Sequence, residues 1–402
     1  MPGVFEGLKV LEMGSGAAGP VATKYLAEQG ANVIRIESAK RPDFLRILWV
    51  TPDSKHGLDG SPMYVLLNPN KRIIAVNMKS EEGVALARRL ALWADVLCEN
   101  FAPGPMDRWG LSWEALRVDN PGLVMVSGCL FGQTGPHRSY PGFGAQGSAL
   151  SGFNQLTGWP DRGSLGPAGT ITDSLSPRYV ALAMVAALFE RKRTGLGQYI
   201  DVAQVETAVY SQSEVLVRYS ANGEVVERRG NEHEQAAPHG IYPCRGEESW
   251  LAIAVHSDAQ WARFRELVSA DWAQRSDFDQ RAGRLAHRAA LDECIAVWTA
   301  GQVADELMQE LQTRGIDAGV ARDLQGLVED PQLSSRGHFE SVDHVHLGAL
   351  EFERSGIRLS ANPGGFDLAG PNLGEHTQEV LEDELNMSPL EIEELRAAGA
   401  LE

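Results

Sequence analysis

The residues near the N-terminus best suited to chemistry are the glycines of Gly14-Ser-Gly-Ala-Ala-Gly19, which match a GxGxxG pattern. This hexapeptide follows an apolar run expected as a strand over 8–13 and precedes a helix expected over about 20–29. Glu37 ends the next apolar run, about 20 residues further on, where a dinucleotide-binding turn places an acid for a ribose. Other doubly wound folds use the same turn, and there the start of the helix accepts a different phosphate or none. The motif alone therefore leaves NAD or flavin binding and a plain strand-to-helix turn both open.

A single carboxylate precedes the most apolar helix of the chain. Asp173 follows a glycine-rich segment and stands directly before a helix expected over 174–193. An aspartate at that place acts as an N-cap, a structural role worth about 1 kcal/mol. The helix contains the apolar run 180–189, which is too short to span a bilayer and is typical of a buried helix.

The pattern of apolar runs predicts the framework that must position these side chains. Strands are expected over 8–13, 32–37, 72–77, 95–98, 123–127 and 198–202. Helices are expected after Ser80, over 113–117, near 145–156 and over about 203–220. This alternation predicts an α/β fold with a parallel sheet.

The second half of the chain has a different organisation. A polar stretch over 222–235 is linker-like and precedes a smaller α/β segment. That segment has expected strands at 249–255 and 317–320, and expected helices near 258–268, 286–300 and 302–314. Strand-like runs at 343–353 and 356–359 then precede a helix over 388–398.

The composition narrows the classes of partner. The 402 residues include 36 Lys plus Arg and 54 Asp plus Glu, for a net charge of −18. So acidic a chain is a poor general binder of nucleic acids and anionic membranes, and an anionic substrate would need a local basic pocket. The four cysteines form no CxxC pair, the histidines show no metal-ligand spacing, and the N-terminus has no signal-peptide pattern. We therefore expect a soluble, cytoplasmic protein that binds no metal, nucleic acid or membrane.

Further motifs occur along the chain in a fixed order. They are Gly30–Glu37, Asn70–Arg72, Asn77–Lys79, Asp95–Gly104, Asp107–Arg108, Gly132–Pro136, Ala149–Gly152, Leu156–Gly158, Arg193–Gln198, His239–Pro243 and Leu251–Ala254. Together they resemble the family III CoA-transferases of the CaiB/BaiF type, which include formyl-CoA transferase, carnitine CoA-transferase and α-methylacyl-CoA racemase. The resemblance covers the chain from about residue 5 to the C-terminal helix. It outweighs the glycine hexapeptide, so NAD is not expected.

The resemblance implies an architecture. A Rossmann-like large domain is expected from residues 1–220 and 335–402, with a small α/β domain over 226–330 inserted between them. Two chains of this kind interlock, so a homodimer is expected. A heteromer with a homologous subunit stays open as an alternative.

The resemblance also implies the chemistry. Asp173 matches the covalent nucleophile, which would form an aspartyl anhydride and then an aspartyl-CoA thioester. CoA or acyl-CoA is thus the expected substrate, with succinyl-CoA a plausible donor and a dicarboxylic acid a plausible acceptor. The matching CoA contacts are Ala17, Ala18, Val76, Lys79, Asn100, Phe101, Ala102, Arg108, Phe143 and Gly144. Arg178 and His239 are candidates for the acceptor's carboxylate, with a surface or dimer contact as the other interpretation of Arg178.

Two departures from the family pattern bear on function. Ser38 follows Glu37 where some relatives place a basic residue, which puts one phosphate contact in doubt. Phe143-Gly144 stands where the racemase branch would need an acid–base pair, and this favours a transferase. An acyl-CoA racemase or isomerase, and a CoA-binding subunit without activity of its own, remain as alternatives.

Overall fold

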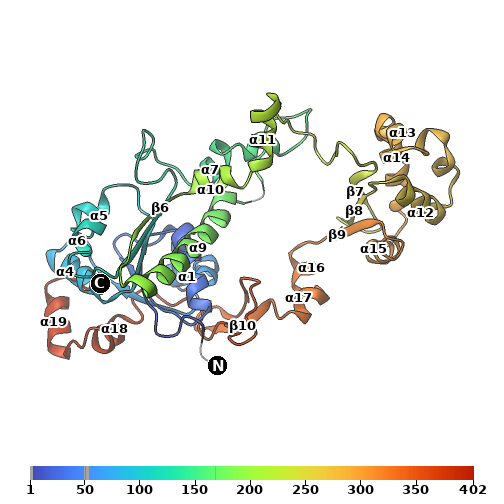
Figure 1. Ribbon diagram of the computed structural model, residues 1–402. Helices are drawn as coiled ribbons and strands as arrows, with labels where there is room; N and C mark the ends of the chain where they lie inside the picture. Colours follow the sequence, from blue (N-terminus) through green and yellow to red (C-terminus); the bar gives the residue numbers. More distant parts are fainter. Residues whose placement is uncertain (1–2, 49, 51–53, 168) are drawn as a thin grey trace. The chain divides into compact units, whose positions relative to one another are not determined.

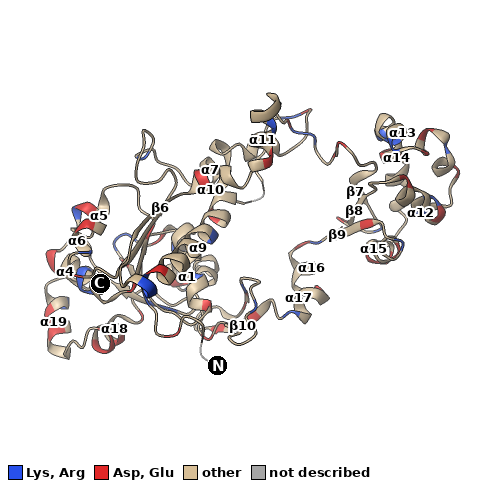
Figure 2. Ribbon diagram, viewed as in Figure 1, with Lys and Arg blue, Asp and Glu red and all other residues tan. Residues whose placement is uncertain are grey.

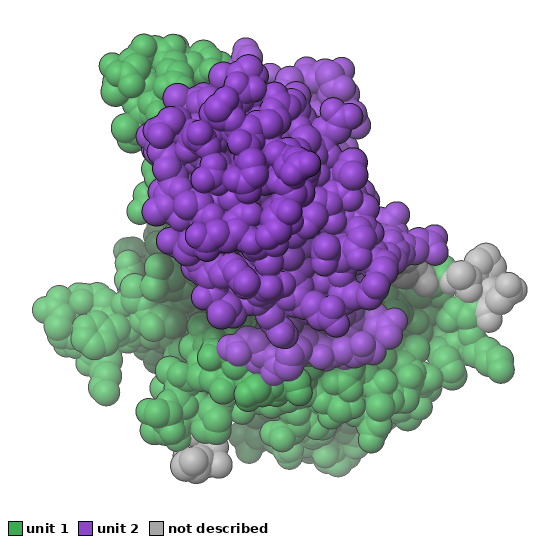
Figure 3. All heavy atoms as spheres, turned by 90° about the vertical axis from the view of Figure 1, so that its right-hand side faces the viewer, with its two compact units in different colours: residues 1–154, 166–226, 334–402 green, residues 155–165, 227–333 purple. Residues whose placement is uncertain are grey.

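The computed structural model describes residues 3–48, 50, 54–167 and 169–402. The chain divides into two compact units, coloured separately in Figure 3. Unit 1 comprises Met1–Asn154, Gly166–Val226 and Ser334–Glu402, and unit 2 comprises Gln155–Leu165 and Glu227–Leu333. Unit 1 thus draws on both ends of the chain, and unit 2 includes a short segment from before the long helix of unit 1.

A six-stranded parallel sheet forms the centre of unit 1 (Figure 1). Its strands are β1 (Lys9–Met13), β2 (Asn32–Glu37), β3 (Lys71–Ala75), β4 (Val96–Glu99), β5 (Val124–Cys129) and β6 (Tyr199–Ala203). They confirm the six strands expected from the apolar runs to within two residues at each end. The spatial order is β3-β2-β1-β4-β5-β6, so the direction of winding reverses between β1 and β4.

Helices cover both faces of this sheet. The helices of unit 1, some of which lie away from the sheet, are α1 (Ala18–Glu28), α2 (Phe44–Ile47), α3 (Pro62–Leu67), α4 (Glu81–Trp93), α5 (Pro105–Arg108), α6 (Trp113–Leu116), α7 (Gly144–Leu150), α8 (Phe153–Leu156), α9 (Ile171–Thr194), α10 (Gln204–Tyr210), α11 (Ser213–Asn222), α17 (Pro331–Ser335), α18 (Thr377–Asp383) and α19 (Pro389–Ala397). α8 and α17 each cross a boundary between the two units.

Neighbouring residues of β1 show how the two faces are filled, because successive side chains of a strand point to opposite sides. Val10 packs with Leu26 of α1 and Met184 of α9 in one cluster of buried residues. Leu11 packs with Leu90 of α4 in the cluster on the other face. Both strand residues are fully buried, as a parallel sheet covered on both faces requires.

The C-terminal segment belongs to the second of these clusters. Val380 of α18 and Ile392 of α19 are buried in it, and Val76 pairs with Leu401 in a β-bridge. α19 begins at a capping box, in which the hydroxyl of Ser388 accepts from the N–H of Glu391 and the Glu391 carboxylate accepts from the N–H of Ser388. The C-terminal helix is confirmed, and its packing makes it part of unit 1.

Unit 2 is built on a three-stranded antiparallel sheet of β7 (His239–Pro243), β8 (Trp250–Ala254) and β9 (Asp317–Ala321), in the order β7-β8-β9. Its helices are α12 (Asp258–Val268), α13 (Arg281–Ala286), α14 (Arg288–Thr299), α15 (Ala304–Thr313) and α16 (Leu324–Val328). Trp261, Phe264 and Leu291 lie in its core.

Some expected elements differ from the structure. The helix expected near 145–156 is two short helices, because Gly152 adopts a φ of +95° that ends α7. The helix expected over 203–220 is likewise divided into α10 and α11. The run 343–353 is an antiparallel hairpin of β10 (Phe339–His344) and β11 (Gly348–Glu353). The strand expected at 356–359 is wrong, because Gly356 has a φ of +79° and the chain leaves the sheet there.

The start of α9 corrects the N-cap interpretation of Asp173. The helix begins at Ile171, so Thr170 is the N-cap residue and Asp173 lies inside the first turn. The carboxylate of Asp173 accepts a hydrogen bond from a side chain on α10. It is thus available for a role other than capping.

Candidate active site

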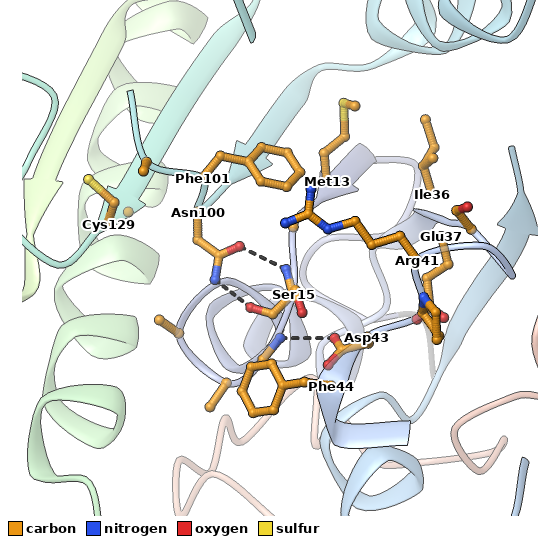
Figure 4. Close-up of a pocket in the computed structure, with 18 of the residues that line it drawn as sticks. Met13, Ser15, Ile36, Glu37, Arg41, Asp43, Phe44, Asn100, Phe101 and Cys129 are labelled. Atoms are coloured by element: carbon orange, nitrogen blue, oxygen red, sulfur yellow. Dashed lines mark hydrogen bonds between the residues drawn. The ribbon is translucent and has the colours of Figure 1, made fainter. Parts of the chain in front are cut away.

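A cavity of about 630 Å³ opens at the carboxyl ends of the parallel strands, where β1 and β4 are neighbours. Sites in open α/β sheets form at this kind of reversal, since the loops after the two strands run in opposite directions. Its lining, part of which Figure 4 shows, comprises Met13 to Ala18, Ile36 to Ser38, Lys40 to Phe44, Asn77 to Lys79, Asn100 to Ala102, Trp109, Gly128 to Leu130, Gly142, Phe143, Asp173 and Gln204.

The glycine hexapeptide forms the turn between β1 and the start of α1, and side chains accept from the amides of Ser15 and Gly16 (Figure 4). The N–H of Ser15 donates to Oδ1 of Asn100 at 3.0 Å, and Nδ2 of Asn100 donates to the Ser15 carbonyl at 2.7 Å. The N–H of Gly16 donates to Oδ2 of Asp43 at 2.9 Å. A Cβ on Gly14 would lie 1.9 Å from Oδ1 of Asn100, so a larger residue is excluded there. The turn is tied to the end of β4 and does not present these amides to a pyrophosphate.

Buried charged side chains on β1, β2 and β3 form a network that includes Asp43, the residue that accepts from Gly16. Arg35 forms ion pairs with Glu12 at 2.8 Å, with Glu37 at 2.9 Å and with Asp43. Lys71 pairs with Glu12 at 2.8 Å. Burial opposes ionisation of Glu12, but Lys71 and Arg35 outweigh burial and hold the pKa of Glu12 below its usual value. Burial lowers the pKa of Lys71 to about 8.

Glu37 is occupied within the same network. Its carboxylate pairs with Arg35 at 2.9 Å and with Arg46 at 2.7 Å, and it accepts from the hydroxyl of Tyr64. An acid held in this way is not free to bind a ribose, which removes the main support for the dinucleotide interpretation.

Three cations line the cavity: Lys40, Arg41 and Lys79. All three side chains are exposed, and Lys40 also pairs with Glu402 at 3.3 Å. The side chain of Arg41 points into the pocket in Figure 4. Lys40 and Arg41 provide positive charge close to Ser38. Ser38 is the position at which some relatives have a basic residue and this chain does not.

Asp173 is half-buried in the lining, and two other elements enclose its carboxylate. Nε2 of Gln204, the first residue of α10, donates to Oδ1 of Asp173 at 3.1 Å. A Cβ on Gly144, the first residue of α7, would lie 2.3 Å from Oδ2 of Asp173. Burial raises the pKa of Asp173 above its ordinary value, although the hydrogen bonds from Thr170 and Gln204 act in the opposite direction.

Another buried acid, Glu99, lies next to the lining residue Asn100. Glu99 ends β4 directly before Asn100, and burial raises its pKa to about 7. Its carboxylate accepts from the N–H of Phe101 at 2.7 Å, and it therefore fixes the start of the loop that carries the lining residues Asn100 to Ala102. The ring of Phe101 packs edge-on against Trp109, with centroids 5.5 Å apart.

The structure brings together most of the residues expected from the sequence. Eight of the eleven line one cavity: Ala17, Ala18, Lys79, Asn100, Phe101, Ala102, Phe143 and Asp173. Gly144 adjoins Asp173, Val76 is buried in the core, and Arg108 is an exposed residue of α5 outside the lining. Arg178 is also exposed and donates to the Ser174 carbonyl one turn earlier in α9. His239 lies in unit 2, where its Nδ1 contacts the Asn231 carbonyl at 2.6 Å.

Sequence reasoning missed four polar residues of the lining: Lys40, Arg41, Asp43 and Gln204. The basic pair before Pro42 was a usable signal for a phosphate contact. Gln204 had only a weak signal, its place at the start of a helix expected after a strand.

Two features are absent from the residues that the structure describes. No helix there has the length and apolar character that crossing a membrane requires. No group of three or more His, Cys, Asp or Glu side chains within the described ranges could hold a metal ion.

The profile described as CoA-transferase family III matches residues 5–377 of this chain. The chain therefore belongs to the family III CoA-transferases, and it is a CoA-transferase. It is 34% identical over 398 residues to succinyl-CoA–D-citramalate CoA-transferase of Chloroflexus aurantiacus, with 98% of each chain covered. It is 32% identical over 381 residues to succinate–glutarate CoA-transferase of Agrobacterium fabrum, covering 93% of this chain and 94% of that one. The crystal structure of a CaiB/BaiF family protein from Brucella suis superposes with a TM-score of 0.87 at 31% identity, over 96% of this chain and 100% of that one.

Proposed function

We propose that this enzyme moves CoA from succinyl-CoA to a dicarboxylic acid through covalent intermediates on Asp173. The observation that carries the proposal is a half-buried carboxylate with a raised pKa in the same cavity as the glycine turn and three cations. The names of three relatives pair succinyl-CoA with D-citramalate, succinyl-CoA with L-malate, and succinate with glutarate, which supports the choice of substrates.

The proposed reaction uses the carboxylate of Asp173 as nucleophile. It attacks the carbonyl of the donor thioester, the CoA thiolate leaves, and an aspartyl anhydride forms. The thiolate then attacks Cγ of Asp173 and releases the donor acid, which leaves CoA joined to Asp173 as a thioester. The acceptor carboxylate attacks the same Cγ and displaces the CoA thiolate, which forms a second anhydride. The thiolate then attacks the acyl carbon of the acceptor to give the product thioester and a free Asp173 carboxylate.

The cavity supports this proposal by its charge. The protein carries −18 overall, and acidic residues are spread over outer helices such as α5, α18 and α19 (Figure 2). Lys40, Arg41 and Lys79 supply a local positive field, which an anionic CoA ester needs on so acidic a protein. We assign the phosphates of CoA to these cations and the pantetheine arm to the loop of Asn100, Phe101 and Ala102, which lines the same cavity as Asp173.

The exposed face of α9 supports a dimer as the functional form. Leu182 is 67% exposed and Phe189 is 75% exposed, and α11 adds Val217 at 63% and Tyr219 at 61%. Large apolar side chains exposed on the surface of helices mark an association surface. We propose that a second copy of the chain covers them. A homologous subunit is the alternative, because the names of two relatives describe α and β subunits of one malate CoA-transferase.

The cytoplasm is the proposed compartment, since all four cysteines are free.

Trapping with hydroxylamine tests the nucleophile. The protein is incubated with succinyl-CoA and hydroxylamine, digested, and the peptide containing Asp173 is analysed by mass spectrometry. A hydroxamate on Asp173 is expected in the native protein, and Asp173→Asn should lose both the hydroxamate and turnover. The exposed Asp161→Asn variant is the control and should behave as the native protein.

The other outcomes separate the alternatives. Undiminished CoA transfer by Asp173→Asn would refute the proposal. Solvent deuterium entering the α-carbon of an acyl-CoA, without transfer, would indicate an isomerase. Tight CoA binding with no turnover of any thioester would indicate a subunit that needs a homologous partner, and the mass of the particle in solution would identify the assembly.

A further inference from the structure

We propose that Gln204 is a catalytic residue, whose side-chain amide stabilises the negative charge that develops on Oδ1 of Asp173 each time Cγ of Asp173 is attacked. The inference rests on the proposed function and assigns one group within it. Nε2 of Gln204 lies 3.1 Å from Oδ1, and both residues line the cavity. A carboxylate only accepts hydrogen bonds, so the amide nitrogen and not the amide oxygen must face Asp173.

The position of Gln204 is fixed by the elements around it. It directly follows β6, it begins α10, and the residue is 5% exposed. The N–H of the next residue, Val205, donates to the Leu130 carbonyl at 3.1 Å, which ties the start of α10 to the loop after β5. α10 packs along α9, the helix that carries Asp173. The amide is therefore pre-organised, as a group that stabilises transient charge must be.

The two oxygens of the carboxylate have different surroundings. Oδ1 accepts from Gln204, whereas Oδ2 lies beside Gly144, which has no side chain. The side chain of Thr170 also donates to the carboxylate. Oδ2 is therefore the oxygen assigned to form the bond to the acyl carbon, and Oδ1 remains the carbonyl oxygen of the anhydride and of the thioester.

The charge on Oδ1 then changes during each step at Cγ. In the anhydride and in the thioester Oδ1 is a neutral carbonyl oxygen. When the thiolate or the acceptor carboxylate adds to Cγ, the π electron pair moves onto Oδ1. The pair returns when the donor acid or the thiolate leaves, so electrons and atoms balance. A donor to Oδ1 strengthens in these transition states relative to the covalent intermediates, and this difference accelerates the steps. Loss of one such donor typically lowers kcat by about 10²- to 10³-fold.

Gln204→Met tests the inference, because it preserves length and removes the donor. We expect kcat to fall about 10²- to 10³-fold, with binding of CoA unchanged. Gln212→Met is the matched control: Gln212 donates through the same amide group to the Ser151 carbonyl at 2.7 Å and is not part of the lining. Turnover by Gln204→Met within threefold of this control would overturn the inference.

Two further measurements separate stabilisation of Oδ1 from a merely structural role. With 13C at Cγ of aspartate, the infrared carbonyl band of the trapped Asp173–CoA thioester should lie at lower frequency in the native protein than in Gln204→Met, since a hydrogen bond weakens the C=O bond. An unchanged band would overturn the inference.

If Gln204→Met does not fold, Gln204→Glu serves instead. Its protonated carboxyl can donate to Oδ1, so the activity of this variant relative to the native protein should rise as the pH falls. A constant ratio across pH would overturn the inference.

The results separate a failure of the proposed function from a failure of the role assigned to Gln204. If no covalent adduct forms on Asp173 in the native protein, the proposed function fails whatever Gln204 does. If the adduct forms and Gln204→Met turns over like the control, only the role of Gln204 fails.

Discussion

Substituting Gly144 by alanine is the sharpest steric test of the site. Gly144 does not have a positive φ, so the backbone accepts alanine without strain. The new Cβ, however, would lie 2.3 Å from Oδ2 of Asp173 and 2.6 Å from Cβ of Thr170. Ordinary contact begins at 3.4 Å, so about 1 Å must be absorbed at the carboxylate or at the start of α9.

A displacement of about 1 Å at a reacting group can cost about 10²-fold in rate, or about 2.7 kcal/mol of activation free energy. We therefore expect kcat for CoA transfer from succinyl-CoA to fall about 10²-fold in Gly144→Ala. Binding of CoA by calorimetry should be nearly unchanged, because the cations proposed to bind its phosphates are not displaced. Gly163→Ala is the control, since its Cβ would meet nothing within 4 Å. A kcat of Gly144→Ala within threefold of Gly163→Ala would refute the assignment of Asp173 as the reacting group.

Three further results are expected. The pKa of Asp173 is raised above 3.8 by burial and only the ionised carboxylate attacks, so kcat/KM should fall as the pH drops through a midpoint above 3.8; a midpoint below that value would contradict the raised pKa. Lys71→Met should lower the free energy of unfolding in urea by about 3–5 kcal/mol, because it removes one of the two buried cations that pair with Glu12. The control is Lys192→Met, at an exposed residue, which should change the free energy of unfolding by less than about 0.5 kcal/mol. Arg41→Gln should weaken CoA binding in calorimetry about tenfold, with a smaller loss at high salt and little change in kcat; equal affinity at low salt would exclude Arg41 as a phosphate contact.

Much of the large unit could be predicted because its signals are local. Each strand of the parallel sheet is a short apolar run, and helices such as α4 and α19 begin at a serine that caps them. The motif after β4 and the glycine turn after β1 could be placed at the same edge, since both follow strands of one parallel sheet. Residues that end these strands were therefore found, and with them most of the cavity lining.

Boundaries and partners were harder to predict. The start of α9 was placed three residues late, because a helix start is read from capping patterns, and Asp173 has the residue type of a cap without being one. α10 and α11 read as one helix because the break near Gln212 has no glycine or proline to mark it.

The sequence by itself determined the family, the order of the strands along the chain and the carboxylate expected to react, because these depend on residue types and their spacing. Only the tertiary structure decided what each side chain touches. Asn100 bonds to Ser15 across 85 positions, and Gln204 bonds to Asp173 across 31. Arg41 and Lys79 reach one cavity from segments after different strands. Such contacts arise from the packing of whole elements, whose free energy comes from many buried side chains at once, and no local pattern of residues records them.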